Sequence, residues 1–175
     1  MLTDIFLIRH ATPLQNTGVA YRTMPGPDLS DHGRQEARLA AAFLADKALE
    51  HLFVSPFART TQTAEQILEQ LDLPVTFTQL IAENPPDESA DKVRARIREF
   101  LNMVMDASCT RIGVVSHGNP IQVFIQELGQ GQIDLKQYVF SGNNPAPPAG
   151  IWHARRDGEG WRLELAFQPG RAASM

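Results

Sequence analysis

The segment Ile5-Phe-Leu-Ile-Arg-His10 joins an apolar run directly to two basic side chains, Arg9 and His10. Four consecutive apolar residues that include β-branched ones are typical of a buried β-strand. A small residue and the turn-forming pair Thr12-Pro13 follow. Because unpaired charge beside a hydrophobic core is costly, this arrangement indicates that a ligand of opposite charge binds where the strand ends.

The composition indicates a globular protein with one hydrophobic core. The chain has 175 residues, 43% of them apolar and 21% charged, and we expect a single domain at 1–168 with a flexible tail at 169–175. The net charge of −4 without a basic face argues against a nucleic-acid partner. The sequence shows no apolar run long enough to span a membrane, so we expect no membrane partner. It shows no leader signal, and its lone Cys109 cannot form an internal disulfide, so we expect a cytoplasmic location. Nothing in the sequence predicts the oligomeric state.

Strands and helices alternate along the rest of the chain. Apolar and alternating patterns predict strands at 52–54, 74–78, 112–116, 151–155 and 161–167, the last two forming a hairpin. Periodic patterns predict helices at 35–48, after Ser55-Pro56, at 90–105 and from Asn119-Pro120 to Leu128. We expect Ser30, Ser55 and Asn119 to act as N-caps. These elements predict an α/β fold, a three-layer sandwich with a mainly parallel sheet flanked by helices and a C-terminal β-hairpin.

Three of the predicted strand-to-helix junctions deliver basic groups. These groups are Arg9 and His10, Arg59, and His117. Ligands of open α/β sheets bind at the carboxyl ends of the strands, where helix N-termini also point. An arginine fork can bind two oxygens of a phosphate. The junctions therefore predict a pocket for a tetrahedral dianion. We expect no carboxylate of the protein to pair with the basic groups in this pocket.

Two histidines in one phosphate pocket suit phosphoryl transfer. One can attack phosphorus as a neutral imidazole, and the other can donate a hydrogen bond to a phosphoryl oxygen. A leaving alkoxide needs a proton, for which Glu83 is the best-placed acid and Asp87 and Glu88 are alternatives. No Asp/His/Glu cluster has metal-ligand spacing, so we expect neither a metal nor a cofactor.

Four short motifs resemble those of the histidine phosphatase superfamily, also called phosphoglycerate mutase-like, and they occur in the family's order between residues 5 and 118. They are Leu7-Ile-Arg-His-Ala11, Leu29-Ser-Asp-His-Gly33 with Ala37, Ser55-Pro-Phe-Ala-Arg59 with Gln62-Thr-Ala64, and Ser116-His-Gly118. The chain resembles a compact member of this family.

The resemblance implies a phosphatase that hydrolyses phosphomonoesters, in which His10 becomes phosphorylated and Glu83 donates the proton. The residues that it implies for phosphate binding are Arg9, Asn16, Arg59, His117 and Gly118. The segment after Glu83 is much shorter than in true mutases and lacks their Gly-x-Trp-Glu-Gly pattern, so we do not expect mutase activity. The loops 12–28, 84–89 and 142–150 would set specificity, with Arg22 and Lys136 as added basic groups.

Two other functions stay open at this point. A compact, open-mouthed member of this family could be a phosphohistidine protein phosphatase, so the partner would be either a small phosphorylated substrate or a phosphoprotein. A non-catalytic module that binds a phosphorylated ligand is an alternative of another class. The intact set of Arg9, His10, Arg59 and His117 argues against such a module.

Overall fold

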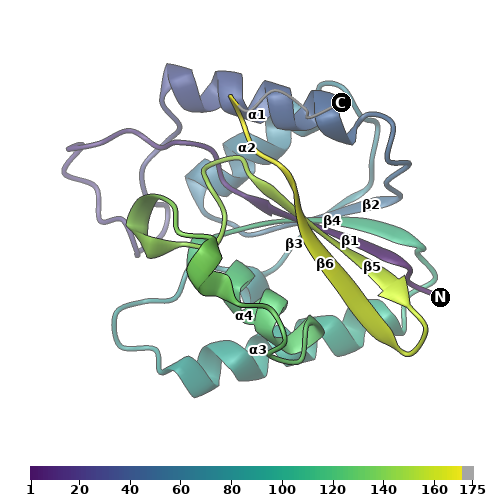
Figure 1. Ribbon diagram of the computed structural model, residues 1–175. Coiled ribbons are helices and arrows are strands. Elements are labelled where there is room, and N and C mark those ends of the chain that lie inside the picture. The colour runs from purple at the N-terminus through teal and green to yellow at the C-terminus, as the bar shows by residue number, and fades with distance from the viewer. Residues whose placement is uncertain (171–175) are drawn as a thin grey trace.

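The computed structural model describes residues 1–170 and contains one six-stranded sheet with four α-helices (Figure 1). In chain order the elements are β1 (Asp4–Arg9), α1 (Asp31–Leu44), β2 (His51–Val54), α2 (Ala58–Leu68), β3 (Val75–Phe77), α3 (Ala90–Met105), β4 (Arg111–Ser116), α4 (Gly118–Leu128), β5 (Ile151–Asp157) and β6 (Gly160–Phe167). Short 3-10 helices at Gln79–Ile81, Leu135–Gln137 and Ser141–Asn143 were not predicted. Residues 171–175, which make up most of the expected tail, lie outside the described residues.

The strand order is β3-β2-β4-β1-β5-β6. The first four strands in this order run parallel, and β5 and β6 form an antiparallel hairpin beside β1. The predicted α/β sandwich with a mainly parallel sheet and a C-terminal hairpin is confirmed. Within residues 1–170, none of the helices combines the length and apolar character needed to cross a membrane.

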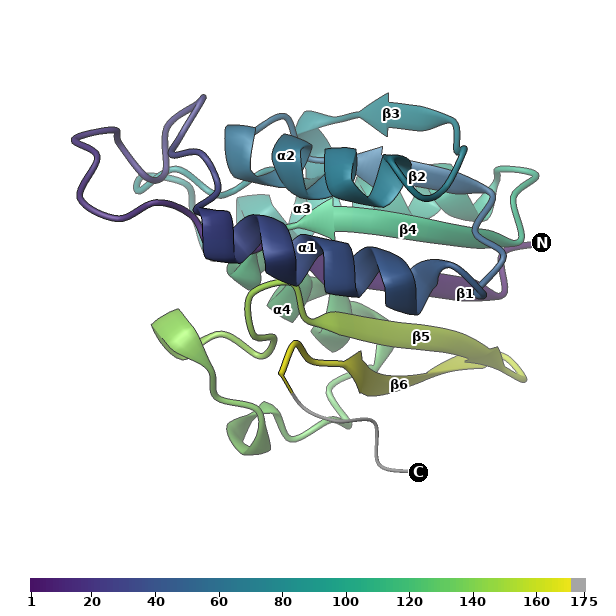
Figure 2. The ribbon, with the colours of Figure 1, turned by 90° about the horizontal axis from the view of Figure 1, so that it is seen from above.

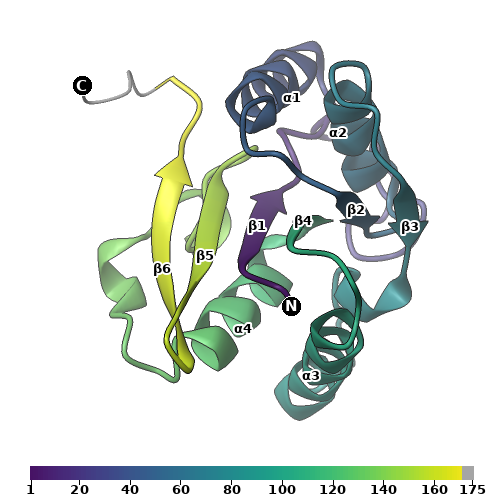
Figure 3. The same cartoon turned by 90° about the vertical axis from the view of Figure 1, so that its right-hand side faces the viewer.

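Helices cover both faces of the sheet, α1 and α2 on one side and α3 and α4 on the other (Figure 3). Strand β1 belongs to both cores because successive side chains of a strand point to opposite faces. Phe6 and Ile8 pack in the cluster under α1 and α2, whereas Ile5 and Leu7 pack in the cluster over α3 and α4. All four are buried, so the predicted buried strand is confirmed.

Of the three predicted helix N-caps, one is confirmed and two are wrong. Ser30 caps α1, accepting a hydrogen bond from the Gly33 amide at 3.0 Å, although this helix begins and ends four residues earlier than predicted. Ser55 and Asn119 do not act as caps. Helix α2 begins at Ala58, and α4 begins at Gly118, with Asn119 in its first turn. The Ser55 hydroxyl instead contacts a ring nitrogen of His117 at 2.7 Å, so this interaction replaces the predicted cap.

The carboxyl ends of β1, β2 and β4 lie at one edge of the sheet, where the loop 12–28 also lies (Figure 2). The register pairs Arg9 of β1 with Ser116 of β4. The two histidines that follow these residues therefore emerge side by side.

Candidate active site

His10 follows β1 and is almost fully buried. Its Nδ1 lies 2.8 Å from the carbonyl oxygen of Ala11. A carbonyl oxygen only accepts hydrogen bonds, so Nδ1 carries the proton in this contact and Nε2 keeps its lone pair. The Tyr21 hydroxyl lies 3.3 Å from Nε2. Burial, followed by the charges of Arg59 and Arg9, lowers the pKa of His10 well below its usual value. The ring is therefore neutral at neutral pH.

Arg9 is held by the segment that precedes β5. Its Nη1 donates to the carbonyl oxygen of Ala146 at 2.7 Å and contacts the carbonyl and hydroxyl oxygens of Ser141 at 3.2 and 3.3 Å. Its buried Nε has no hydrogen-bond partner within the described chain. Burial lowers the pKa of this guanidinium, and the neighbouring Tyr21 and Glu83 oppose the shift. Arg9 is thus an oriented cation at the wall of the site.

Arg59 is completely buried beneath the site. Its Nη1 donates to the Tyr21 carbonyl at 3.0 Å, and its Nη2 donates to Glu83 Oε2 at 3.2 Å. The guanidinium carbon lies 4.2 and 4.8 Å from the ring centroids of Tyr21 and Phe57. Such contacts hold the guanidinium through cation–π attraction as well as hydrogen bonds. A side chain at Gly26 would press on Nη1, at 2.7 Å from its Cβ.

His117 occupies the N-cap position of α4 and is completely buried. Its ring centroid lies 5.3 Å from that of His10. Ser55 Oγ is 2.7 Å from Nε2, while Nδ1 has no hydrogen-bond partner among the described residues. Burial, and then the neighbouring His10, lower its pKa well below the usual value. If the Ser55 hydroxyl donates to Nε2, the proton is on Nδ1, which becomes a free donor.

Glu83 follows the 3-10 helix at Gln79–Ile81 and places a carboxylate between Arg59 and His117. Its Oε2 lies 3.2 Å from Arg59 Nη2 and 3.7 Å from His117 Nδ1. The expectation that no carboxylate pairs with the basic groups is therefore wrong. The sequence could not reveal this pairing because the two partners are 24 residues apart.

The two alternative acids point elsewhere. Glu88 forms a fork with Arg96, with oxygen–nitrogen distances of 2.9 and 3.1 Å. Asp87 is exposed, and neither residue lines the cavity beside His10. Of the three acids considered, Glu83 is the one in the cavity wall.

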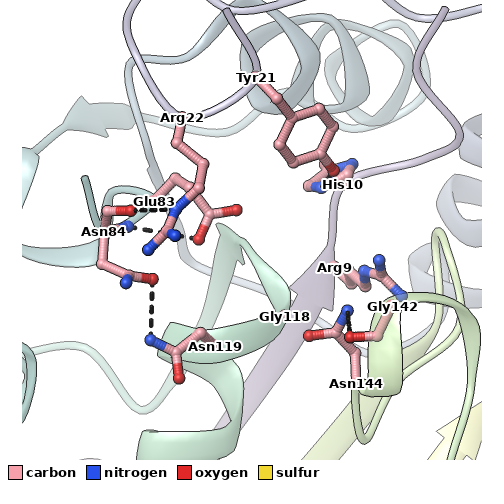
Figure 4. Close-up of a pocket in the computed structure, with 10 residues that line it drawn as sticks. All are labelled: Arg9, His10, Tyr21, Arg22, Glu83, Asn84, Gly118, Asn119, Gly142 and Asn144. Carbon is pink, nitrogen blue, oxygen red and sulfur yellow. Dashed lines mark hydrogen bonds between the residues drawn. The ribbon is translucent and has the colours of Figure 1, made fainter. Parts of the chain in front are cut away.

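A cavity of about 510 Å³ opens over these groups (Figure 4). Its lining consists of polar side chains and glycines, namely Arg9, His10, Tyr21, Arg22, Glu83, Asn84, Gly118, Asn119, Gly142 and Asn144. Gly118 lies so close to the Asn144 amide that a Cβ there would collide with it. Motif reasoning did not assign Tyr21, Asn84 or Asn144 to the site. They lie in the loops 12–28, 84–89 and 142–150, which we expected to set specificity, but these loops have no periodicity that would single out individual residues.

Of the implied phosphate ligands, Arg9 and Gly118 line the cavity and Arg59 and His117 are buried behind it, whereas Asn16 lies apart from them. It lies on the exposed part of the loop 12–28 with a positive φ of 55°, and it does not line the cavity. Its contact with a phosphoryl group stays a prediction. Across residues 1–170, no three His, Cys, Asp or Glu side chains are placed to hold a metal ion.

Other parts of the motifs support the site from beneath. The Thr63 hydroxyl accepts from the Ala11 amide at 3.0 Å and donates to the Arg59 carbonyl at 2.7 Å, linking α2 to the end of β1. Gly33 packs on the backbone of Thr12, where a Cβ would overlap the carbonyl. The side-chain oxygen of Gln62 accepts from the amide of Leu29 at 2.7 Å. These residues keep the loop 12–28 against the strand that carries His10.

A family model described as histidine phosphatase superfamily (branch 1) matches residues 5–84 and 81–168. The chain belongs to this superfamily. The membership confirms the family expected from the four motifs. The two matched ranges include both His10 and His117, whose ring centroids lie 5.3 Å apart.

Curated relatives match part of the chain. Phosphoserine phosphatase 1 of Hydrogenobacter thermophilus is 35% identical over 74 residues, which make up 42% of this chain and 35% of that protein. An uncharacterised protein of Mycobacterium tuberculosis is 34% identical over 73 residues, 42% of this chain and 36% of that protein. The matched segment thus spans about a third of the length of these relatives.

Solved structures match nearly the whole histidine phosphatase fold. A candidate α-ribazole-5′-P phosphatase of Escherichia coli K-12 gives a TM-score of 0.75 at 16% identity, covering 93% of this chain and 96% of that one. Mycobacterial glucosyl-3-phosphoglycerate phosphatase with VO3 gives a TM-score of 0.71 at 19% identity, and the match covers 95% of this chain and 98% of that one. A candidate phosphohistidine phosphatase SixA of Agrobacterium tumefaciens gives a TM-score of 0.69 at 18% identity, and the match covers 93% of this chain and 96% of that one. These likenesses show a shared fold.

Proposed function

We propose that this protein is a phosphatase that hydrolyses phosphomonoesters through a phosphohistidine on Nε2 of His10. The observation that carries the proposal is the hydrogen bond from His10 Nδ1 to the Ala11 carbonyl. It leaves the lone pair of Nε2 in a cavity that the buried cation Arg9 lines. The buried cation Arg59 lies behind this lining and donates to Tyr21 and Glu83. A neutral imidazole beside fixed positive charge is suited to attack a phosphate dianion.

In the first step, Nε2 of His10 forms a bond to phosphorus while the bond from phosphorus to the leaving oxygen breaks. Arg9, Arg59 and the free Nδ1–H of His117 stabilise the charge on the phosphoryl oxygens, because phosphoryl transfer depends mainly on positioning and electrostatics. Glu83, in its protonated form, gives its proton to the leaving alkoxide, which departs as an alcohol.

In the second step, a water molecule attacks the phosphohistidine. The Glu83 carboxylate takes a proton from that water, the bond from phosphorus to Nε2 breaks, and inorganic phosphate leaves. Glu83 regains the proton that the next cycle needs, and His10 returns to its neutral form. One carboxyl group can serve both steps because its Oε2 already lies between Arg59 Nη2 and His117 Nδ1.

Trapping the phosphoenzyme tests this proposal. Rapid quenching with a ³²P-labelled phosphomonoester should yield a labelled protein whose phosphate is lost in acid and kept in base. The His10→Ala variant should carry no label, whereas His32→Ala, which changes an exposed histidine of α1, should be labelled like the natural protein. Label on a serine, or no label in any trapped state, would contradict the mechanism.

A phosphohistidine protein phosphatase is the second candidate. It is favoured by the fold shared with the candidate phosphohistidine phosphatase SixA, whose chain is matched over 96% of its length. Phosphohistidine proteins and small phosphomonoesters, compared by kcat/KM, would separate the two candidates. A non-catalytic binding module would hydrolyse neither of these, nor p-nitrophenyl phosphate. Mutase activity is not expected, because six residues separate Glu83 from the start of α3.

A further inference from the structure

Strand β6 forms one outer edge of the sheet (Figure 2). It pairs with β5 on one side, and within residues 1–170 no backbone hydrogen bond joins it to any other segment. The strand at the opposite edge, β3, has three residues, whereas β6 has eight. Sheets often protect an edge with a short strand, Lys or Pro, because a long unprotected edge pairs readily with another chain. Strand β6 is long and contains neither Lys nor Pro.

The side chains of β6 alternate between the two faces of the sheet. Trp161, Leu163 and Leu165 are half-buried and pack against the hydrophobic cluster over α3 and α4. Arg162 and Glu164 are exposed on the opposite face. In an antiparallel pair of strands, residues that lie directly opposite each other share a face and interact. A strand that fits the free edge of β6 must therefore place apolar residues opposite the first set and complementary charges opposite the second.

The charges on this edge are not balanced by the rest of the chain. Arg162 lies directly opposite Arg155 of β5, and like charges in this position are destabilising. Among residues 1–170, neither arginine has a carboxylate within 4 Å, and Glu164 forms no ion pair. A carboxylate brought to Arg162 by another strand would offset the repulsion between the two arginines.

A second copy of β6 supplies this complement in one register. When two copies pair antiparallel about Leu163, Arg162 of each copy lies opposite Glu164 of the other. The same register places Trp161 opposite Leu165. A two-fold axis at Arg162 or at Glu164 would instead bring like charges together, and an axis between two residues would place apolar residues opposite charged ones. The strand is therefore self-complementary about Leu163, as an isologous two-fold interface requires.

We infer that β6 is a homodimer interface, in which two copies of the chain join their sheets edge to edge with a two-fold axis at Leu163. Backbone hydrogen bonds hold the strands together, while the ion pairs and the apolar row fix their register. Residues 160–166 of each copy take part, far fewer than the roughly 20–30 residues a side of a standard interface, so we expect a Kd on the order of 10 µM. No residue of β6 lines the cavity, so the inference does not depend on the proposed phosphatase function.

Reversal of the charges tests the interface and its register together. Sedimentation velocity between about 1 and 300 µM, a range that spans the expected Kd, should show the natural protein changing from monomer to dimer. Arg162→Glu and Glu164→Arg each place like charges opposite each other twice in the dimer, and each should raise the Kd about tenfold or more. The double variant, Arg162→Glu with Glu164→Arg, exchanges the two charges and should restore a Kd close to the natural one.

Matched controls make the same changes of charge away from β6. Arg38→Glu in α1 and Glu65→Arg in α2 alter exposed residues and should keep the natural Kd. Circular dichroism should show the same secondary structure in all variants. A natural protein that stays monomeric at the highest concentration would overturn the inference. A dimer that neither single reversal weakens, or that the double variant does not restore, would also overturn it.

Cysteine cross-linking checks the register directly. In a Cys109→Ser background, which removes the native free thiol, Leu163→Cys should give a disulfide-linked dimer on mild oxidation. Residues opposite each other at the axis fall within the Cα separation of about 4.4–6.8 Å that a disulfide spans. Leu165→Cys is the control, because its two copies lie four residues apart along the strands, roughly 13 Å, and should not cross-link. Equal cross-linking at both positions, or cross-linking at 165 alone, would overturn the register.

Discussion

The hydroxyl of Tyr21 lies 3.3 Å from Nε2 of His10, on the lone pair that the proposed mechanism uses for attack. Because Nδ1 carries the ring proton, the hydroxyl is the donor in this contact. A reacting phosphorus must come to about 3–3.5 Å from the nucleophile. The hydroxyl and a phosphoryl group therefore cannot occupy this position together, and binding of a substrate displaces the hydroxyl.

The Tyr21→Phe variant should consequently bind phosphate analogues more tightly. Removing the hydroxyl frees Nε2 and keeps an aromatic ring over Arg59, so we expect the Kd of vanadate to fall about twofold to tenfold, the range of one net hydrogen bond. Isothermal calorimetry measures this change, with Tyr138→Phe, whose ring packs on Trp152 outside the cavity, as the control. Weaker binding would mean that the hydroxyl is itself a ligand of the phosphoryl group.

Glu83→Gln should distinguish substrates by the quality of their leaving group. An aryl oxide departs without a proton, whereas an alkoxide does not, so kcat should fall about a hundredfold or more with an alkyl phosphate and far less with p-nitrophenyl phosphate. Steady-state kinetics with both substrates measures this difference. Glu88→Gln is the control because Glu88 pairs with Arg96 outside the cavity. Equal losses with both substrates would indicate a structural role, and no loss would move the acid function elsewhere.

Phosphate should stabilise the fold. Glu83 balances part of the charge on Arg59, but Arg9 has no carboxylate within 4 Å in the described chain and is buried. A buried guanidinium without a carboxylate partner destabilises the fold, and a bound anion offsets this destabilisation. By mass action, phosphate at a hundred times its Kd adds about 2.7 kcal/mol to the free energy of unfolding. Thermal melting in phosphate or vanadate, against chloride at the same ionic strength, measures the effect. An unchanged Tm at high millimolar phosphate would count against the site.

Activity should survive removal of metal ions. The guanidinium groups of Arg9 and Arg59 supply the positive charge that Mg²⁺ provides in other phosphoryl-transfer enzymes. We expect kcat with p-nitrophenyl phosphate to stay within about twofold of its starting value after dialysis against EDTA. Loss of activity that added Mg²⁺ or Zn²⁺ restores would show that this charge balance is misread.

Stability should decrease as the pH falls below neutrality. The pKa values of His10 and His117 are lowered in the folded protein, whereas in the unfolded chain they return to about 6.5. Below pH 6.5 the unfolded chain therefore binds protons that the folded protein does not, and each histidine lowers the free energy of unfolding by up to about 1.4 kcal/mol per pH unit. Urea unfolding between pH 7.5 and 5 measures this slope. His10→Asn should reduce the slope, and an unchanged slope in this variant would contradict the expectation.

The sequence by itself determined the fold and the chemical groups at the strand ends. The apolar run Ile5–Ile8 predicted a buried strand, and strands that alternate with helices predicted a sheet whose carboxyl ends share one edge. That topology is enough to bring His10, His117 and Arg59 together, because each follows a strand in a short junction. The pairing of Arg9 with Ser116 in neighbouring strands realises this expectation.

Only the tertiary structure decided how these groups are held and what shares the cavity with them. The Ser55 hydroxyl holds His117 across 62 residues rather than capping a helix, and Arg22 reaches the Asn84 carbonyl across 62 residues. Tyr21 meets His10 through a loop that has no regular structure of its own. Local sequence patterns carry helix and strand periodicity, but a contact between a loop and a distant backbone carbonyl depends on how the whole chain packs. For that reason the sequence predicted which groups gather at the strand ends and which loops surround them, whereas it did not predict the contacts that Tyr21 and Arg22 make there.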